Sequence, residues 1–265
     1  MTTCFAEELT SPEFGAFVSA RTVGVLPLAA IEPHGPHLPL STDCDIARGH
    51  LHHLPDFVGE DTDVLILPLQ TIGYSAEHAP LSGVFSHTPE HLLQTWTDVI
   101  APFRLAGGRR IILVSSHGGN SETVGLLATR LRAEHTMLAV TAAWLRFGQP
   151  PDLFADEELL YGIHGGAVET SLMLHYWPEA VRTENFADFP SLAATVDRES
   201  QVLSVHGRTR MGWISADLNP AGVTGNALDA SAEKGAASAH HALSSFADLV
   251  ADVAAFDLAQ FRAVK

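Results

Sequence analysis

Four short apolar runs rich in β-branched residues constrain the fold of this chain more than any other feature of its sequence. They cover Thr22–Ala29, Val64–Leu69, Arg110–Ser116 and Met137–Ala143. Each run is largely apolar rather than alternating, which is typical of strands buried on both faces of a sheet. Such a sheet needs a layer of helices on each side. The sequence therefore predicts an α/β fold built on a mainly parallel sheet.

Segments with helical periodicity lie between and after these runs. In the clearest of them, Pro89 opens a stretch whose apolar residues fall on one stripe and which ends at Gly107 and Gly108. Further helices are predicted over about 121–135, 167–176 and 231–256. We expect residues 183–227, rich in turn formers, to form a surface excursion. The fold prediction is a three-layer α/β/α sandwich in which residues 1–265 form a single domain.

The composition argues against several classes of protein. Fifteen Lys and Arg against thirty-one Asp and Glu give a net charge of -16, which disfavours a nucleic-acid-binding protein and a basic protein that binds a membrane surface. No apolar run approaches the roughly 18 residues that span a bilayer, and Glu7 and Glu8 stand where a signal peptide carries basic residues. Cys4 and Cys44 form no disulfide framework. We expect a cytoplasmic protein that binds a small molecule.

Polar side chains gather directly after the predicted strands, where open parallel sheets bind their ligands. Glu32 and His34 follow the first strand, and Pro33 between them favours an extended backbone, so that both side chains leave on the same side. A carboxylate and an imidazole in this arrangement can hold two neighbouring metal ions, and Asp43 could bridge them. Taken alone, the Glu-x-His pattern is also compatible with a solvated loop.

Two glycine-rich segments supply further candidates. His117 opens the segment HGGN, whose glycines allow a ligand close to the backbone and whose helix-start N–H groups could hold an oxyanion. A plain glycine turn capped by Asn120 or Ser121 is the alternative. His164 precedes a second Gly-Gly pair, and Glu169 follows in the first turn of a helix. There the helix dipole tolerates a carboxylate without any ligand.

Most other histidines are expected to be solvated or structural. We interpret His50, His52 and His53 as lying on a solvated helix face, and the same holds for His240 and His241. His37 and His78 lie near the predicted rim of the sheet and remain ambiguous, whereas Cys44 is interpreted as a packing residue.

Together these segments resemble the creatininase family, also called creatinine amidohydrolases. The likeness spans about residues 22–245 and rests on IEPHGPHLPLSTD, GYSAEH, SSHGGN, HGGAVETSLML and NPAGVTGNALDASAEKG, in that order. The resemblance implies a Rossmann-like sandwich that holds two divalent ions per subunit, usually zinc or manganese. Carboxylate and imidazole ligands would also suit iron. It also implies a homo-oligomer, commonly a hexamer.

The resemblance further implies roles for individual residues. Glu32 and His117 correspond to ligands of one ion and His34 to a ligand of the other, with Asp43 bridging. Creatininase itself carries a glutamate for the second ion two residues after the histidine, and this chain has Gly119 there. We therefore expect Glu169, or else Glu122, to complete the second ion.

Four further residues concern catalysis and substrate. His164 matches a proton-shuttling histidine of the family, although Ile163 replaces the acidic residue expected before it. Ser75 matches a serine that contacts the substrate, and the backbone N–H of Gly118 or Gly119 is expected to polarise the substrate oxygen. Family members with HGGN include formamide hydrolases and a peptidase that matures a redox-cofactor peptide, so the reaction class is better defined than the substrate.

The predicted function is a metal-dependent amidohydrolase that cleaves a C–N bond, other than a peptide bond, in a small amide, cyclic amide or formamide. Two ions that share a carboxylate can hold a hydroxide at neutral pH, which would attack the carbonyl while His164 protonates the departing nitrogen. One alternative is a metal-free serine hydrolase that uses Ser75, although the second glycine of G-x-S-x-G is missing. A nucleotide-binding protein and a non-catalytic metal-binding scaffold are the others.

Overall fold

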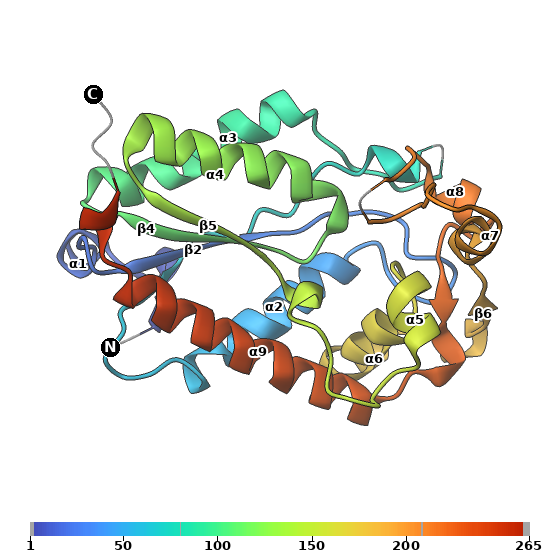
Figure 1. Ribbon diagram of the computed structural model, residues 1–265. Helices are drawn as coiled ribbons and strands as arrows, with labels where there is room; N and C mark the ends of the chain where they lie inside the picture. Colours follow the sequence, from blue (N-terminus) through green and yellow to red (C-terminus); the bar gives the residue numbers. More distant parts are fainter. Residues whose placement is uncertain (1–2, 80, 208, 262–265) are drawn as a thin grey trace.

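The computed structural model is organised around a five-stranded parallel sheet, seen nearly edge-on in Figure 1. It describes residues 3–79, 81–207 and 209–261. The strand order is β1-β3-β2-β4-β5, and every neighbouring pair is parallel. The strands are β1 (Thr3–Phe5), β2 (Val23–Leu28), β3 (Val64–Ile66), β4 (Arg110–Ser115) and β5 (Leu138–Ala143). The predicted parallel α/β architecture is confirmed.

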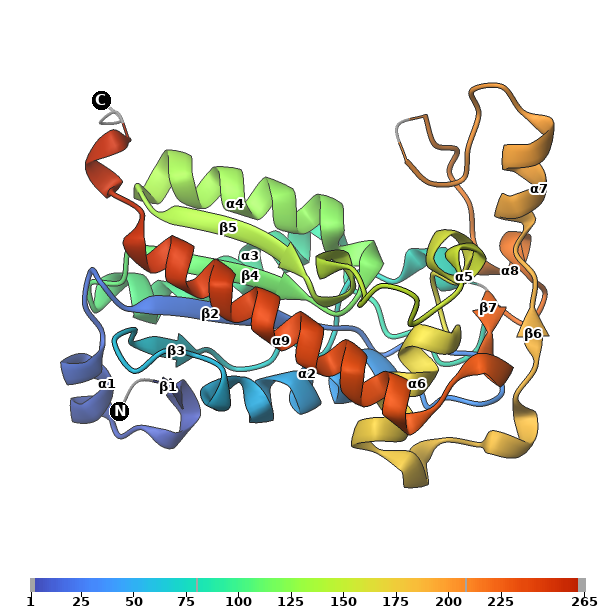
Figure 2. The same ribbon diagram turned by 60° about the horizontal axis from the view of Figure 1, so that its bottom comes forward.

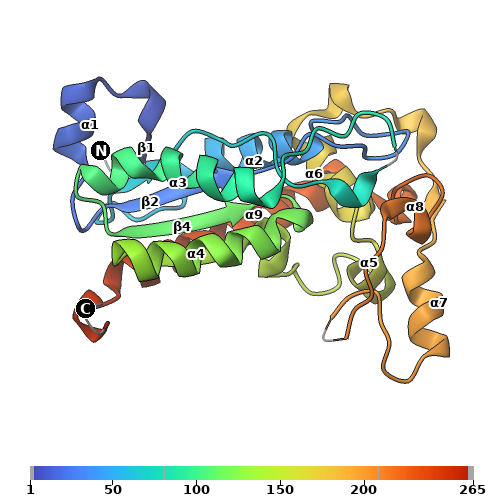
Figure 3. The ribbon, with the colours of Figure 1, turned by 90° about the horizontal axis from the view of Figure 1, so that it is seen from above.

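Helices cover both faces of the sheet. On one face lie α3 (Pro89–Leu105) and α4 (Ser121–His135), and on the other lie α2 (Thr42–His53) and α9 (Ala232–Ala255), as Figures 1 and 3 show. The central strand β2 explains the need for two layers. Leu26 and Leu28 point into the cluster under α3 and α4, whereas Val23 and Val25 point into the cluster under α2 and α9, and all four are fully buried.

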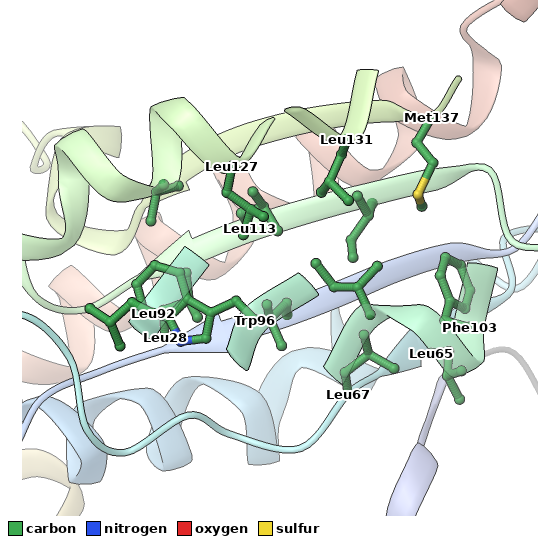
Figure 4. Close-up of a cluster of buried hydrophobic side chains, with 14 of the residues drawn as sticks. Leu28, Leu65, Leu67, Leu92, Trp96, Phe103, Leu113, Leu127, Leu131 and Met137 are labelled. Atoms are coloured by element: carbon green, nitrogen blue, oxygen red, sulfur yellow. The ribbon is translucent and has the colours of Figure 1, made fainter. Parts of the chain in front are cut away.

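The core between the sheet and the α3–α4 layer is filled by large side chains that interdigitate (Figure 4). Leu92 and Trp96 from α3 lie opposite Leu113 of β4 and Leu127 of α4. Phe103 of α3 lies at the other end of the cluster, near Leu65. The helix α3 begins as its sequence predicts. The hydroxyl of Thr88 accepts a hydrogen bond from the backbone of His91, and Pro89 occupies the first turn.

The remaining helices lie at the two ends of the sheet. One is α1 (Ser11–Phe17), next to β1, and the others are α5 (Asp156–Tyr161), α6 (Ala167–Tyr176), α7 (Leu192–Glu199) and α8 (Ser215–Leu218), at the far end in Figure 1. Of these, the sequence predicted only α6. Among the described residues no helix combines the length and hydropathy that crossing a membrane requires.

The helices α6 and α9 approach each other unusually closely. A Cβ atom at Gly235, near the start of α9, would overlap the carbonyl group of Ser171 in α6. The hydroxyl of Ser171 also accepts a hydrogen bond from the backbone N–H of Ser231, which caps α9. The position of α6 is therefore set by backbone contact with the last long helix of the chain.

Residues 183–227 form an excursion beyond the carboxyl end of the sheet, in orange at the right of Figure 2. It contains α7, α8 and a small antiparallel pair, β6 (Asp188–Phe189) and β7 (Gly225–Asn226). The segment has its own buried residues, including Ala193 and Leu218. It returns to the main body where the N–H of Thr224 donates to the carbonyl of His164, at 2.8 Å.

One histidine prediction is wrong. His50 is fully buried in α2, where Nδ1 lies 3.0 Å from the hydroxyl of Tyr176 and the ring packs 4.5 Å from Trp144. Burial lowers the pKa of His50 to about 3. His50 was expected to share a solvated face with His52 and His53, and only the latter two are exposed.

Candidate metal centre

Three histidine rings surround the carboxylate of Glu32, just beyond the end of β2. Oε1 of Glu32 lies 3.1 Å from Nε2 of His78, 3.1 Å from Nδ1 of His117 and 3.8 Å from Nδ1 of His164. His117 follows β4, His78 ends the 3₁₀ turn η3 (Ala76–His78) and His164 precedes α6. Segments far apart in the sequence therefore meet at the carboxyl edge of the sheet, as predicted.

Asp43, in the first turn of α2, faces two different rings with its two oxygens. Oδ1 lies 3.3 Å from Nε2 of His34, and Oδ2 lies 3.3 Å from Nδ1 of His117. Nε2 of His34 also lies 3.8 Å from Oε2 of Glu169. Asp43 therefore stands between two sets of potential ligands, which is the position of a bridging carboxylate.

The candidate ligands form overlapping triads whose ligand atoms lie within 4.8 Å of one another. The triads are Glu32, Asp43 and His117; His34, Asp43 and Glu169; and Glu32, His34 and His164. The first two share Asp43 and consist entirely of buried residues. Two neighbouring cation sites joined by one carboxylate would account for this overlap.

In His34, His117 and His164, one ring nitrogen already donates a hydrogen bond to a backbone carbonyl. Nε2 of His117 donates to the carbonyl of Tyr74 at 2.7 Å, and Nδ1 of His34 donates to that of Glu32 at 3.1 Å. Nε2 of His164 donates to the carbonyl of Pro33 at 2.8 Å. Because a carbonyl oxygen only accepts, each ring turns its other nitrogen toward the carboxylates, as in histidines that bind metal.

Several buried polar atoms at the centre of the cluster lack a hydrogen-bond partner among the described residues. They are Oε1 and Oε2 of Glu32, Nε2 of His34 and Oδ2 of Asp43. Buried polar atoms without a partner are costly and call for a bound group. Carboxylate oxygens and imidazole nitrogens are the donors that zinc, manganese and iron accept, so the residues present fit a divalent metal.

Burial and neighbouring charges shift the pKa values of the ionisable groups in the cluster. Burial raises the pKa of Glu32, but His117 and His78 outweigh it and hold the pKa well below its usual range. Burial lowers the pKa of His34, but Asp43 outweighs it and raises the pKa to about 9. Burial also raises the pKa of Glu169 to about 7. The carboxylates raise the pKa of His34 and of His117, so that protons on these two rings offset the negative charge in the metal-free protein, and a bound cation would take over that task.

His164 is placed by the loop that leads into α6. Its ring packs 4.2 Å from the ring of His34 and 4.3 Å from that of His78. Burial lowers the pKa of His164 well below its usual range, and the two neighbouring rings lower it further. Gly165 next to it has φ +67°, a conformation that favours glycine, and its N–H donates to Glu169 at 2.6 Å. The turn at Gly165 therefore holds both His164 and Glu169 in place.

Of the two candidates for completing the second triad, the structure brings Glu169 into the cluster. The side chain of Glu122 is 76% exposed at the mouth of the adjacent cavity and pairs with Arg210. Ser75 is fully buried, with its hydroxyl 3.5 Å from Nε2 of His117. His37 braces the His164 loop through the carbonyl of Gly165 at 2.9 Å, outside the cluster.

A cavity of about 380 Å³ opens onto this cluster. Gly118 and Gly119, in the 3₁₀ turn η4 (Gly118–Asn120), line it together with Glu32, His117 and His164. The excursion after α6 supplies part of the opposite wall, which consists of Met211, Gly212, Trp213, Ser215, Leu218, Gly222, Val223 and Thr224. None of these residues was predicted to line the site: those from Met211 to Leu218 lie in no motif, and Gly222, Val223 and Thr224 fall in NPAGVTGNALDASAEKG, to which no role was given.

His78 was left ambiguous in the sequence, although it is buried and contacts Glu32. Its place in GYSAEH, near the predicted rim of the sheet, is the signal that could have pointed to it. Asn120 does not cap a helix with its side chain. Instead Oδ1 accepts a hydrogen bond from the N–H of Tyr74 at 3.0 Å, and the amide donates to the carbonyl of Ala29 at 3.2 Å. It ties three strand-end loops together.

Comparison with known proteins identifies the family. The family model described as Creatininase: Creatinine amidohydrolase matches residues 7–250. The chain belongs to the creatininase family. Among relatives in this family, the mycofactocin precursor peptide peptidase of Mycobacterium tuberculosis (strain ATCC 25618 / H37Rv) is 29% identical over 239 residues, covering 86% of this chain and 84% of the relative. The creatinine amidohydrolase of Pseudomonas putida is 29% identical over 205 residues, covering 70% and 76%.

Solved creatininase structures share the fold. The crystal structure of creatinine amidohydrolase (creatininase) has a TM-score of 0.72 and 25% identity, and covers 96% of this chain and 98% of that chain. The structure described as creatininase Mn has a TM-score of 0.72 at 24% identity, covering 95% and 98%. A mutant creatininase of Zn-Zn type has a TM-score of 0.73 at 24% identity, with the same coverage. The family and the fold predicted from the sequence are both confirmed.

Proposed function

We propose that this member of the creatininase family is a hydrolase with two divalent metal ions, zinc or manganese or else iron, that cleaves the C–N bond of a small amide, cyclic amide or formamide. One observation carries the proposal. Three histidines, the buried His34 and His117 and the half-buried His164, each give their far N–H to a backbone carbonyl and turn the other nitrogen toward carboxylate oxygens, several of which lack partners. This is how proteins orient imidazoles toward metal ions.

The distances between the candidate ligands divide them between two ions. Glu32 and His117 would hold one ion, and His34 and Glu169 would hold the other, with Asp43 shared between them. When bound, such a pair of ions lowers the pKa of a water molecule toward neutrality and polarises a carbonyl group. The names of the zinc and manganese forms of creatininase agree with this choice of metals.

The protein's own groups would do the rest of the chemistry. Because Nε2 of His164 is occupied by the carbonyl of Pro33, Nδ1 is the atom that can accept a proton and return it to the departing nitrogen. An amide nitrogen leaves poorly unless it is protonated. The backbone of Gly118 and Gly119 lines the cavity and could donate N–H groups to the substrate oxygen. A cavity of about 380 Å³ suits a small substrate.

Metal content and turnover of the purified protein test the proposal. Elemental analysis should find zinc, manganese or iron, and a screen of small amides, lactams, formamides and short peptides should identify a substrate. Asp43→Ala should lose metal and activity together, because Asp43 contacts both ligand sets. His164→Ala should keep its metal and lose about 10²–10⁴-fold in kcat, the range of general acid–base catalysis.

Two results would contradict this function. Full turnover by the His164→Ala variant would remove the assigned proton carrier. Inhibition by a serine-directed phosphonate, but not by a chelator, would favour Ser75 as a nucleophile instead. The complete burial of Ser75 and the 3₁₀ turn that follows it, where a nucleophile elbow has a helix, argue against that mechanism.

A further inference from the structure

The second glycine of HGGN leaves room for one particular side chain. A Cβ atom at Gly119 would overlap the carboxylate of Glu77, and it would lie 2.5 Å from both Nε2 of His117 and the carbonyl oxygen of Tyr74. Glu77 reaches this place from the turn η3, which also carries His78. Only a glycine at 119 allows the Glu77 carboxylate to lie against His117.

Glu77 lies on the side of the His117 ring away from the predicted metal ions. Oε1 of Glu77 is 3.5 Å from Nε2 of His117, whereas Nδ1 of the same ring faces Glu32 and Asp43. Nε2 already donates to the carbonyl of Tyr74, so the carboxylate adds negative charge beside an N–H that is held in place. The side chain of Glu77 is only 17% exposed, so water screens this interaction weakly.

We propose that Glu77 is a positioning residue for the metal centre, which holds and polarises His117 from behind so that its Nδ1 binds a cation more tightly. A carboxylate behind a metal-binding imidazole fixes the orientation of the ring and raises its basicity. Gly119 is part of this arrangement, because it provides the space that Glu77 fills. The inference rests on the metal centre proposed above and adds a residue that belongs to none of the candidate ligand triads.

The test compares Glu77→Gln with Glu122→Gln in the full-length protein. Both variants remove one negative charge from the lining of the same cavity, but Glu122 is 76% exposed and pairs with Arg210 at its mouth. The affinity of the metal-free proteins for Zn²⁺ is measured by competition with a chromogenic chelator. Glu77→Gln should bind Zn²⁺ about 10–100-fold more weakly than the unmodified protein, the usual effect of losing such a partner. Glu122→Gln should stay within about threefold, as expected for an exposed charge.

A second measurement separates positioning from direct binding. The visible absorption of the Co²⁺-loaded protein reports the number and geometry of metal ligands. It should keep its band positions and intensity in Glu77→Gln, because Glu77 lies on the far side of the His117 ring. A spectrum that changes as it does on losing a ligand would overturn the proposal.

The remaining outcomes are also decisive. Equal Zn²⁺ affinity of Glu77→Gln and the unmodified protein would overturn the role of Glu77 while leaving the metal centre intact. If the unmodified protein bound no metal, the proposed function itself would fail. Should Glu77→Gln not fold, Glu77→Asp is measured in the same way, since it keeps the charge but withdraws it by one methylene group. It is expected to show an intermediate loss, and an unchanged affinity would overturn the proposal.

Discussion

The carboxylate of Glu158 should be one of the main supports of the loop that carries His164. Glu158 is 7% exposed, and it accepts hydrogen bonds from the N–H groups of Ala167 at 2.5 Å and Asn226 at 2.8 Å. Cβ atoms at Gly162 or Gly166 would collide with it, so the backbone closes tightly around the side chain. Glu158 thereby joins the start of α6 to the end of the excursion.

Replacing Glu158 by Ala leaves both N–H groups without this acceptor. An unsatisfied buried N–H costs about 1–3 kcal/mol, and the partly exposed N–H of Asn226 costs less, so we expect the free energy of unfolding to fall by about 2–4 kcal/mol. The measurement is urea unfolding of the metal-free protein, so that bound metal does not mask the change. Glu158→Gln keeps one acceptor oxygen and should lose about half as much.

Glu157 provides the matched control, because it precedes Glu158 in α5 and is exposed. Glu157→Ala should change the free energy of unfolding by no more than about 0.5 kcal/mol. A loss below about 1 kcal/mol for Glu158→Ala would refute the reasoning. It would mean that water or a shifted backbone satisfies those N–H groups without the carboxylate.

Two further predictions concern the metal. Removal of metal by a chelator should lower the Tm, and added zinc or manganese should restore it. At a free metal concentration 100 times Kd, the bound metal stabilises the folded protein by about 2.7 kcal/mol. A Tm that does not change on addition of the chelator would contradict the proposed metal centre. Binding should also release protons, because burial lowers the pKa of His34 but Asp43 raises it to about 9 in the metal-free protein. The apparent affinity for Zn²⁺ should therefore rise from pH 6 to pH 9, measured by chelator competition at each pH, and a constant affinity would be incompatible with His34 as a ligand.

The sequence predicts the elements that depend on local signals. The start of α3 follows from Thr88 and Pro89, and the bounds of α4 and α6 agree with the prediction because apolar periodicity defines them. The strand β3 is shorter than predicted and ends at Ile66, two residues before Pro68, which cannot donate to a ladder. The edge strand β1 has only three residues, too few for an alternation pattern to show.

The residues of the candidate site also fall into two groups, those that local sequence signals predict and those that they do not. Glu32, His34 and His117 directly follow strands, so their convergence could be predicted from the parallel sheet. His78 could not be assigned, because its contact with Glu32 depends on how the loop after β3 folds back as the turn η3. His50 was misjudged for a different reason. It lies seven residues after Asp43 on α2, so both fall on the buried face, and the periodicity of the whole helix would have indicated this.

The contact between Gly235 and Ser171 links the candidate metal centre to a residue that carries no functional group. Because α6 rests directly on the backbone of α9, even a methyl group at position 235 must push the two helix axes apart. Because Glu169 lies on α6, it would move with this helix away from His34 and Asp43. The lack of a side chain at position 235 thus sets the spacing of the candidate ligands, and transplanting this centre into another scaffold would require copying that helix crossing along with the ligands themselves.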